Sequence, residues 1–466
     1  MIRIFRHYVS KALMFLGMVE AAILILSFNL AHILRFPGGV IQVENGADQY
    51  LKAIVFTVVV CSSLMAMGLY DRHSREAFSG VLLRLVLGFI GAFVILAMLF
   101  YAMPFLFMGR GVLVLEFLFS FLGIFISRLI FSRYFSDSNA GKRQIMVLGV
   151  GEKAATIDRL LRRKGDRRTF HIVGYVALAQ EERVVRSEDI IEYDMPLSDL
   201  AKRCKVDELV VAMDDSRVGF PMKEVLDCKM RGIEVIDLLS FFEEQSGKIL
   251  INQLKPSWLI FSDGFHVGKI KAVIKRMFDL FACLILLSIT WPVMIIVTIA
   301  IAIEGKFRHP VLYLQQRIGE NGRVFNVVKF RSMSVDAEKD GKACWAVDND
   351  CRVTRVGAII RKLRIDELPQ IFNVLKGDMS FVGPRPERPQ FVSELADNIP
   401  YYKERHRVKP GITGWAQICY PYGASQNDAM EKLQYDLYYV KNFSIFLDLM
   451  VIFQTAQVVL WGKGAR

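Results

Sequence analysis

The sequence predicts a membrane protein in three parts: a four-helix transmembrane bundle, a Rossmann-like parallel α/β domain, and a mainly α domain attached to the bilayer by a re-entrant helix. Two observations predict this fold class. Of the 466 residues, 53% are hydrophobic, more than an average soluble domain holds. The excess is gathered in long apolar stretches, and between them short apolar strands alternate with helical segments. We expect the parts at residues 1–135, 136–255 and 256–466.

The charge and the cysteines exclude several classes of protein. Lys and Arg number 59 against 47 Asp and Glu, and this net charge of +12 is spread along the chain. A modest, dispersed excess argues against nucleic acid as a partner and suits loops that face anionic lipid headgroups. Seven cysteines are too sparse, and odd in number, for a disulfide scaffold, and none forms a CxxC pair, so a reduced, cytosol-facing chain fits best.

Four apolar stretches in the first part are each long enough to cross a hydrocarbon core of about 30 Å, which takes about 20 residues. They lie at residues 12–34, 51–70, 80–105 and 112–131. Basic residues gather before the first stretch, around the second loop and after the fourth stretch, whereas the other loops hold little beyond Arg35 and Arg110. By the positive-inside rule, both ends of the bundle are cytoplasmic.

Polar residues also occur inside these stretches, namely Glu20, Asn29, His32 and Glu116. Ionisable groups at membrane depth can mark a substrate path. They can equally form hydrogen bonds between helices or reach from a helix end to the interface. The sequence leaves both interpretations open.

The second part follows a polar linker at residues 132–143. A buried strand at 144–148 runs into Gly149-x-Gly151-x-x-Ala154, and further strands are expected at 172–176, 209–213 and 234–238. Helical segments separate these strands, which predicts a parallel α/β sheet. Gly149 and Gly151 would let backbone N–H groups meet a phosphate, but the second strand does not end in the acidic residue that a ribose needs. A nucleotide site and a structural or regulatory module both fit this pattern.

The third part opens on a fifth apolar stretch, residues 277–303, with Pro292 near its middle. Proline removes a helical hydrogen bond and kinks the axis, and Ser288 and Thr290 are placed to bond the freed carbonyl. Both flanks are basic, with Lys269, Lys271, Lys275 and Arg276 before the stretch and Lys306, Arg308, Arg317 and Arg323 after it. A helix at about 272–304 that enters, bends at Pro292 and returns keeps both flanks inside. An ordinary kinked span, the alternative, would place everything after residue 304 outside the cytoplasm.

Polar residues become dense in the last third of the chain, where Asp366 and Glu367 stand just before Pro369. Proline is accepted in a first helical turn, so both carboxylates should lie at or beside an N-cap, where the helix dipole lowers their pKa. An ionised Asp can attack phosphorus, and an adjacent carboxylate can hold a divalent cation or relay a proton. Capping alone needs one acid, yet an isolated acidic pair in this position is more often a cap.

A phosphate-binding arginine is indicated by Pro384-Arg385-Pro386. The two prolines fix the backbone, so the guanidinium of Arg385 loses little entropy when it binds a phosphate. Further positive charge for a pyrophosphate comes from Lys329, Arg331 and Arg317. Structural salt bridges are the alternative role of these three side chains.

Five motifs in this last third carry a resemblance to a known family. They are Lys329-Phe-Arg-Ser-Met, Asp366-Glu-Leu-Pro-Gln, Asn373-Val-Leu-Lys-Gly-Asp378-Met-Ser, Val382-Gly-Pro-Arg-Pro-Glu387 and Lys409-Pro-Gly-Ile-Thr-Gly-Trp-Ala-Gln417. In this order they resemble the bacterial polyprenyl-phosphate sugar-1-phosphate transferases, monotopic phosphoglycosyl transferases that begin exopolysaccharide and O-antigen synthesis. The four spans and the α/β module are similar to the large members. Residues 420–425, 432–439 and 462–466 resemble the subgroup of PEP-CTERM/exosortase exopolysaccharide loci.

The resemblance implies a ping-pong reaction on Asp366. This carboxylate would attack the β-phosphate of a UDP-sugar, expel UMP and carry the phosphosugar until undecaprenyl phosphate accepts it. Glu367 would assist, the two carboxylates would bind Mg²⁺, and Arg385 and Lys329 would hold phosphate oxygens. The re-entrant helix would bring the lipid phosphate to a cytoplasmic catalytic domain at the bacterial inner membrane.

Two departures from the family pattern leave local roles open. Trp291 precedes Pro292 where many members have Ser, and Tyr420-Pro-Tyr422 replaces the common Asn-Gly-Arg. A homodimer through the spans or the α/β module is compatible with a chain of this size. Two other functions are alternatives to this one. The first is a non-catalytic membrane scaffold whose α/β module senses a nucleotide, and the second is an export channel, which would need more spans and more intramembrane charge.

Overall fold

The computed structural model shows two compact units along the chain. One comprises Met1–Ile2 and Tyr8–Ser246, and the other comprises Arg3–His7 and Gly247–Arg466. The structure describes residues 2–4, 7–9, 11–36, 46–70, 78–135, 142–162, 167, 169–178, 181–192, 195–214, 219–254, 256–262, 264–265, 268–335, 352–420, 423 and 425–460. Residues 421–422 and 462–466, on which the subgroup resemblance partly rests, lie outside the described residues. At the N-terminus, β1 (Ile2–Ile4) and β2 (His7–Val9) form a two-stranded sheet.

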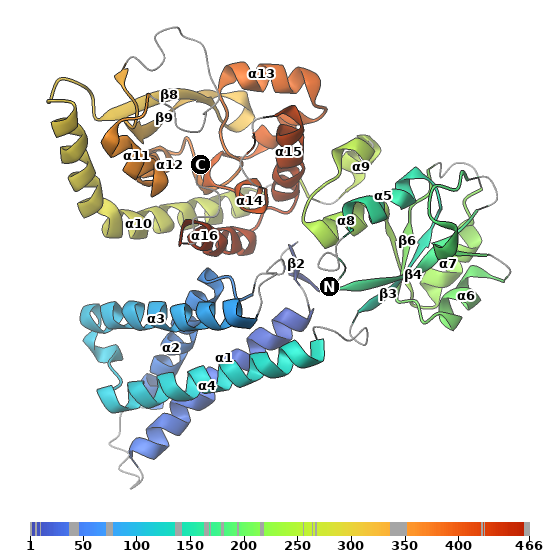
Figure 1. The fold of residues 1–466 in the computed structure, drawn as a ribbon, viewed down its shortest axis with the longest axis horizontal. Coiled ribbons are helices and arrows are strands. Elements are labelled where there is room, and N and C mark those ends of the chain that lie inside the picture. Colours follow the sequence, from blue (N-terminus) through green and yellow to red (C-terminus); the bar gives the residue numbers. More distant parts are fainter. Residues whose placement is uncertain are drawn as a thin grey trace. The chain divides into compact units, whose positions relative to one another are not determined.

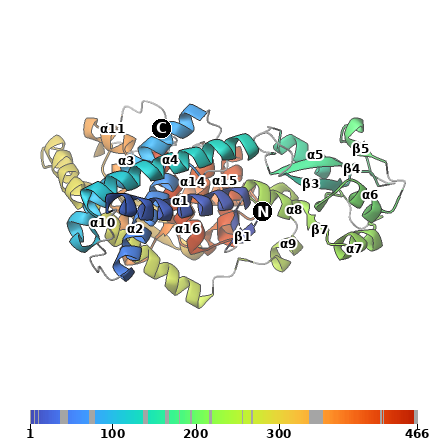
Figure 2. The same cartoon turned by 90° about the horizontal axis from the view of Figure 1, so that it is seen from below.

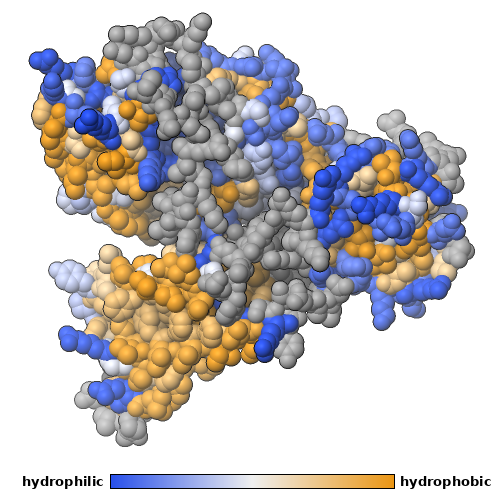
Figure 3. Space-filling view, in the orientation of Figure 1, coloured by the Kyte–Doolittle hydropathy of each residue, from blue (hydrophilic) through white to orange (hydrophobic). Residues whose placement is uncertain are grey.

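Long apolar helices occupy the four predicted stretches. They are α1 (Lys11–Arg35), α2 (Gly46–Ala66), α3 (Phe78–Ala102) and α4 (Arg110–Phe135), with a short 3₁₀ turn η1 (Pro104–Leu106) before α4. By length and composition, five helices in the described part of the chain could cross a membrane, these four and α10 (Lys269–Glu304). α1 runs alongside α4 (Figures 1 and 2). Hydrophobic side chains cover the outer face of the bundle, as expected for contact with lipid (Figure 3).

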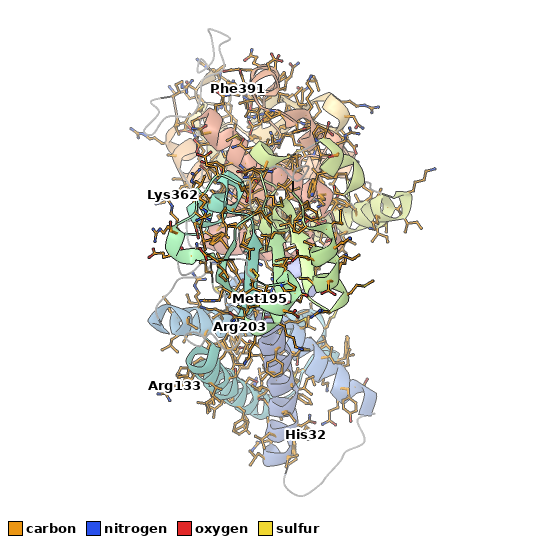
Figure 4. The ribbon with its side chains drawn as sticks, turned by 90° about the vertical axis from the view of Figure 1, so that its right-hand side faces the viewer. His32, Arg133, Met195, Arg203, Lys362 and Phe391 are labelled. Carbon is orange, nitrogen blue, oxygen red and sulfur yellow. The ribbon has the colours of Figure 1, made fainter. Side chains whose placement is uncertain are left out.

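The polar residues inside the bundle differ in the contacts that they make. Glu20 is fully buried, and its Oε1 lies 2.8 Å from Nε of Arg128 on α4, while Tyr70 also donates a hydrogen bond to Glu20. For Glu20 the interhelical interpretation is therefore confirmed. Asn29 bonds the carbonyl of its own helix, and His32 lies near the end of α1 (Figure 4).

A five-stranded parallel sheet with the order β5-β4-β3-β6-β7 forms the rest of the first unit, which confirms the predicted α/β domain. Its strands are β3 (Arg143–Leu148), β4 (Phe170–Val176), β5 (Ile190–Ile191), β6 (Glu208–Val211) and β7 (Glu234–Asp237). The helices are α5 (Glu152–Leu160), α6 (Leu197–Arg203), α7 (Met222–Met230) and α8 (Leu238–Ser246), and η3 (Ser187–Asp189) precedes β5. α6 and α7 pack together on a core that includes Met146, Leu148 and Leu209.

The second unit is mainly helical, as predicted, and holds two small sheets. An antiparallel hairpin joins β8 (Leu312–Ile318) to β9 (Val324–Phe330), and a parallel pair joins β10 (Ser380–Val382) to β11 (Gly411–Thr413). The helices besides α10 are α9 (Pro256–Phe261), α11 (Arg355–Lys362), α12 (Gln370–Lys376), α13 (Pro389–Asn398), α14 (Trp415–Cys419), α15 (Gln426–Lys441) and α16 (Ile445–Leu460). Short 3₁₀ turns are η4 (Ile251–Gln253), η5 (Glu320–Gly322), η7 (Ile365–Glu367) and η8 (Tyr402–Arg407).

The helix α10 is continuous over 36 residues, contains Pro292, and is drawn with a sharp bend in Figure 1. Sharp helix bends are usually caused by proline. The hydroxyl of Ser288 donates to the carbonyl of Ile285 (2.8 Å), and that of Thr290 donates to Leu286 (2.7 Å). The expectation that these hydroxyls bond the carbonyl freed by Pro292, that of Ser288, is therefore wrong, because each donates to another carbonyl of the preceding turn.

Candidate active site

The acidic pair lies in the short turn η7, directly before α12. Pro369 has helical dihedral angles (φ −61°, ψ −14°) and caps α12, so the predicted helix start after the pair is confirmed. The turn begins at Arg364, whose φ of 57° places a non-glycine residue in the left-handed region. Such backbone strain often occurs at functional sites.

Glu367 forms hydrogen bonds with Lys329 and Arg385, two of the cations that the sequence predicts to bind phosphate. Its Oε1 accepts a hydrogen bond from Nζ of Lys329 at 3.0 Å and another from Nη2 of Arg385 at 3.1 Å. The Glu367 side chain is only 12% exposed, so these charge-assisted bonds form away from bulk water. Three motifs that are far apart in the sequence therefore meet at one carboxylate.

The surroundings drive the pKa values of the two neighbouring carboxyls apart. Burial alone would raise the pKa of Glu367, but the charges of Lys329 and Arg385 outweigh it and hold that pKa below its usual range. Burial, followed by the negative charge of Glu367, raises the pKa of Asp366. The expected lowering by the helix dipole is thus wrong for Asp366. Adjacent carboxyls with separated pKa values are typical of sites where the two groups have different tasks.

Asp366 offers a free oxygen. Its buried Oδ1 has no hydrogen-bond partner among the described residues. A buried carboxylate oxygen without a partner is costly unless a ligand, an ion or water satisfies it. Among the described residues no group of three or more His, Cys, Asp or Glu side chains could hold a metal ion. Mg²⁺ often uses only one or two carboxylates together with substrate phosphates, so Asp366 and Glu367 fit this ion.

The side-chain amide of Asn373 holds the acidic turn against the hairpin. Its Oδ1 accepts from the N–H of Val328 (2.9 Å), and its Nδ2 donates to the carbonyl of Asn326 (2.7 Å). These two bonds fix α12 beside β9, which carries Lys329. The motif that begins at Asn373 does not by itself reveal this role, although an amide in a short apolar helix signals a specific polar contact.

The other predicted cations lie elsewhere. Arg317 donates to Oε1 of Gln315 and, at 3.0 Å, to the carbonyl of Pro386. Burial lowers the pKa of Arg317 to about 10. Arg331 is buried, and its guanidinium lies beside Gly305 at the C-terminal end of α10. Neither forms a hydrogen bond or ion pair with Glu367 in the described residues, so their phosphate-binding roles stay predictions.

The membrane helix is joined to the loop that carries Arg385. Lys275 on α10 is buried, and its Nζ lies 3.0 Å from Asp279 and 2.9 Å from Asp448 on α16. Asp279 accepts from Ser380 Oγ at 3.0 Å, and Ser380 begins β10 just before the loop. Lys275, one of the basic residues before the fifth apolar stretch, thus bonds two buried carboxylates of its own unit.

The backbone N–H groups at the glycine turn of the α/β domain are bonded by carboxylates of the same chain. Asp214 accepts from the N–H groups of Glu152 and Lys153, both at 2.8 Å, and Glu181 accepts from the N–H of Val150 at 2.8 Å. A Cβ on Gly151 would lie 2.0 Å from Oδ2 of Asp214. The close approach of Asp214 is thus enough to explain a glycine here. A nucleotide at Gly149 and Gly151 stays a prediction, and its phosphate would have to displace Asp214.

Two regions of the chain match known protein families. Residues 270–462 match the bacterial sugar transferase family, and residues 65–218 match a CoA-binding domain. The chain is 40% identical over 288 residues to a UDP-N-acetylgalactosamine-undecaprenyl-phosphate N-acetylgalactosaminephosphotransferase of Aeromonas hydrophila, covering 61% of this chain and 64% of the relative. It is 36% identical over 277 residues to a UDP-glucose:undecaprenyl-phosphate glucose-1-phosphate transferase of Klebsiella pneumoniae, covering 57% and 58%. The match thus spans less than two thirds of these relatives.

By its family match, the unit that carries this site is of the sugar transferase class. A smaller relative fixes the family. The uncharacterized sugar transferase EpsL of Bacillus subtilis is 43% identical over 198 residues, which cover 42% of this chain and 91% of EpsL. The chain belongs to the bacterial sugar transferase family.

Proposed function

We propose that this protein transfers a sugar-1-phosphate from a UDP-sugar to undecaprenyl phosphate, the first membrane step of exopolysaccharide or O-antigen synthesis. The observation that carries the proposal is that two adjacent carboxylates make different contacts. Glu367 binds two cations, whereas Asp366 keeps a buried oxygen without a partner in the described residues. The names of the two longer relatives, which include undecaprenyl phosphate and a sugar phosphate, support the same reaction class.

The reaction proceeds in two displacements at phosphorus. A carboxylate oxygen of Asp366 attacks the β-phosphorus of the UDP-sugar, the bond from that phosphorus to the bridging oxygen breaks, and UMP leaves with the electron pair. A phosphate oxygen of undecaprenyl phosphate then attacks the phosphosugar on Asp366 and releases the carboxylate. Lys329 and Arg385 lie beside the pair and hold the non-bridging oxygens, where negative charge develops.

Magnesium belongs to the proposal as a resident ion. Asp366 and Glu367 would hold it, and it would neutralise the charge of the pyrophosphate. The fit rests on the unpartnered Oδ1 of Asp366 and on the usual preference of Mg²⁺ for one or two carboxylates plus phosphates. Lys329 and Arg385 contribute positive charge to the same place.

The membrane arrangement is the second element of the proposal. α1–α4 span the bacterial inner membrane with both ends in the cytoplasm, and α10 enters the cytoplasmic leaflet, bends and returns. The bend of α10, Pro292 within it and basic residues on both flanks support this topology. The lipid phosphate then meets Asp366 on the cytoplasmic side. The exopolysaccharide subgroup and a homodimer stay predictions.

The test is UMP release by the purified protein in vesicles that contain undecaprenyl phosphate and Mg²⁺. We expect the wild type to release UMP from at least one of UDP-glucose, UDP-galactose and the UDP-N-acetyl sugars. The Asp366→Asn variant should release UMP at least a thousandfold more slowly. Asp397→Asn, at an exposed position of α13, is the matched control and should keep the wild-type rate. Silence of the wild type with every sugar would favour the scaffold instead, and an active Asp366→Asn variant would refute the nucleophile.

A further inference from the structure

The loop that presents Arg385 is held through its carbonyl groups. Four consecutive carbonyls accept a hydrogen bond from outside the loop, each at 3.0 Å: Pro384 from the N–H of Gly411, Arg385 from Nη2 of Arg405, Pro386 from Nη1 of Arg317, and Glu387 from the N–H of Ile318. Pro384 and Pro386 have no N–H groups, so the loop cannot continue β10 as a regular ladder. Two arginine side chains supply donors where backbone donors are missing.

Arg405 is placed for this task by a buried ion pair. Its side chain is 6% exposed and lies 2.7 Å from Oδ2 of Asp436 on α15, which is 2% exposed. Its Nη1 donates to the hydroxyl of Tyr402 at 2.8 Å. The guanidinium therefore bonds three groups at once: a carboxylate, a hydroxyl and the carbonyl of Arg385.

A buried ion pair of this kind is weak as a source of stability. Removing both charges from water costs free energy that their attraction does not always return, and apolar replacements are often as stable. The Arg405–Asp436 pair is therefore better explained by what it holds in place. The group it holds is the backbone of Arg385, whose own guanidinium lies 3.1 Å from Glu367.

We propose that Arg405, fixed by Asp436, is a positioning residue that aims the guanidinium of Arg385 at Glu367 and at the diphosphate of the sugar donor. The guanidinium of Arg405 is buried and is engaged by Asp436, Tyr402 and the carbonyl of Arg385, so we assign it a role through Arg385. This role rests on the proposed function, because Arg385 has a diphosphate to bind only if the donor is a UDP-sugar. This role is not evident from the sequence, because Arg405 lies in a basic Arg-His-Arg run that is typical of a solvated surface.

The test compares Arg405→Lys with Arg407→Lys. Arg407 lies two residues further along the same turn, is exposed and pairs with Glu404, so it is the matched control. A lysine at 405 can pair with Asp436 but cannot also reach the Arg385 carbonyl and Tyr402. With the UDP-sugar that the wild type uses fastest, we expect kcat/KM to fall at least tenfold, mainly through a higher KM for the donor, with the KM for undecaprenyl phosphate unchanged.

A role in stability alone would give a different result. Loss of folded protein lowers the apparent kcat and leaves the donor KM unchanged, and that outcome would overturn the proposal. In addition, Arg405→Lys combined with Arg385→Lys should be no slower than Arg385→Lys alone, because both act through one guanidinium. If the effects of the two substitutions on kcat/KM multiply instead, Arg405 does not act through Arg385 and the proposal is contradicted.

A milder variant keeps the proposal testable if Arg405→Lys does not fold. Tyr402→Phe removes one partner of Arg405 and leaves the ion pair intact, so it should raise the donor KM about two- to fivefold. An unchanged donor KM in this variant would also count against the proposal. If the wild type releases UMP and the variants match it, only the positioning role fails. If the wild type releases no UMP with any donor, the proposed function fails and the positioning role with it.

Discussion

At the scale of single residues, the site depends on two neighbouring carboxyls that titrate differently. Asp366 must be ionised to attack phosphorus, and burial together with the charge of Glu367 raises its pKa. Glu367 has a lowered pKa and stays ionised throughout the range in which enzymes are assayed. The pH dependence of the first displacement should therefore report Asp366.

We expect kcat/KM for the donor to fall at low pH along an acid limb that lies above about 3.9, the value of an ordinary aspartate. The sign follows from the shift, because a raised pKa keeps Asp366 protonated, and so unreactive, to higher pH. Initial rates of UMP release between pH 4 and pH 8 measure this, with samples returned to pH 7 to exclude denaturation. A limb at or below about 3.9 would show that positive charge at the site, Mg²⁺ included, outweighs burial and the charge of Glu367 at Asp366.

The sequence predicted the central residues of the site but not their pairings. Asp366, Glu367, Lys329 and Arg385 were expected to act together, and the structure brings the last three into contact. Arg331 is only two residues from Lys329, but β9 ends at Phe330, so its side chain lies beside Gly305 instead. Which cation pairs with which carboxylate depends on where a strand ends and on backbone contacts of distant loops, which composition and spacing do not reveal.

At the scale of elements, α10 decides the topology of the catalytic unit. Both basic flanks should lie on the cytoplasmic side if the helix enters and returns. Gly305 is a poor place for a reporter, because a Cβ there would lie 2.7 Å from the guanidinium of Arg331. Lys269 and Arg308 are exposed at the two ends and are better positions.

We expect cysteines at Lys269 and at Arg308, each introduced into a chain without its native cysteines, to react only with reagents that reach the cytoplasm. Right-side-out and inverted vesicles with an impermeant maleimide measure this. A cysteine at Arg110, exposed at the first residue of α4 and expected to face outward, is the control and should show the opposite pattern. Labelling of the Arg308 position from the outer face would establish an ordinary span and refute the re-entrant topology.

The glycine turn shows why an element can be predicted when its role cannot. The strand–turn–helix at residues 143–160 was expected from alternation and from the glycines, and it is present. Its donors are bonded by Asp214 and Glu181, which follow the turn by dozens of residues. Strand order in the sheet likewise depends on long-range pairing that local patterns do not contain.

At the scale of the whole molecule, the family match and the compact second unit coincide. Residues 270–462 match the bacterial sugar transferase family, and the unit from Gly247 to Arg466 contains them. A relative of which 91% is matched by 198 residues indicates that this part exists as a separate protein. The second unit therefore corresponds to nearly the whole of a shorter relative.

We expect the fragment of residues 247–466, purified in detergent or vesicles, to release UMP within about tenfold of the rate of the full chain. All residues proposed for the chemistry, Asp366, Glu367, Lys329 and Arg385, lie in this fragment. The same fragment with Asp366→Asn is the control for background hydrolysis. A fragment that folds, as judged by circular dichroism, yet releases no UMP would show that the first unit is needed for catalysis.

The central claim is the covalent phosphosugar on Asp366, and it can be tested without the lipid acceptor. The protein is incubated with Mg²⁺ and its UDP-sugar alone, and peptide mass spectrometry is combined with UMP quantification. We predict a sugar-phosphate adduct on the peptide that contains Asp366 and at most one UMP per enzyme, with turnover only after undecaprenyl phosphate is added. UMP release that requires undecaprenyl phosphate, with no adduct at any time, would contradict the account.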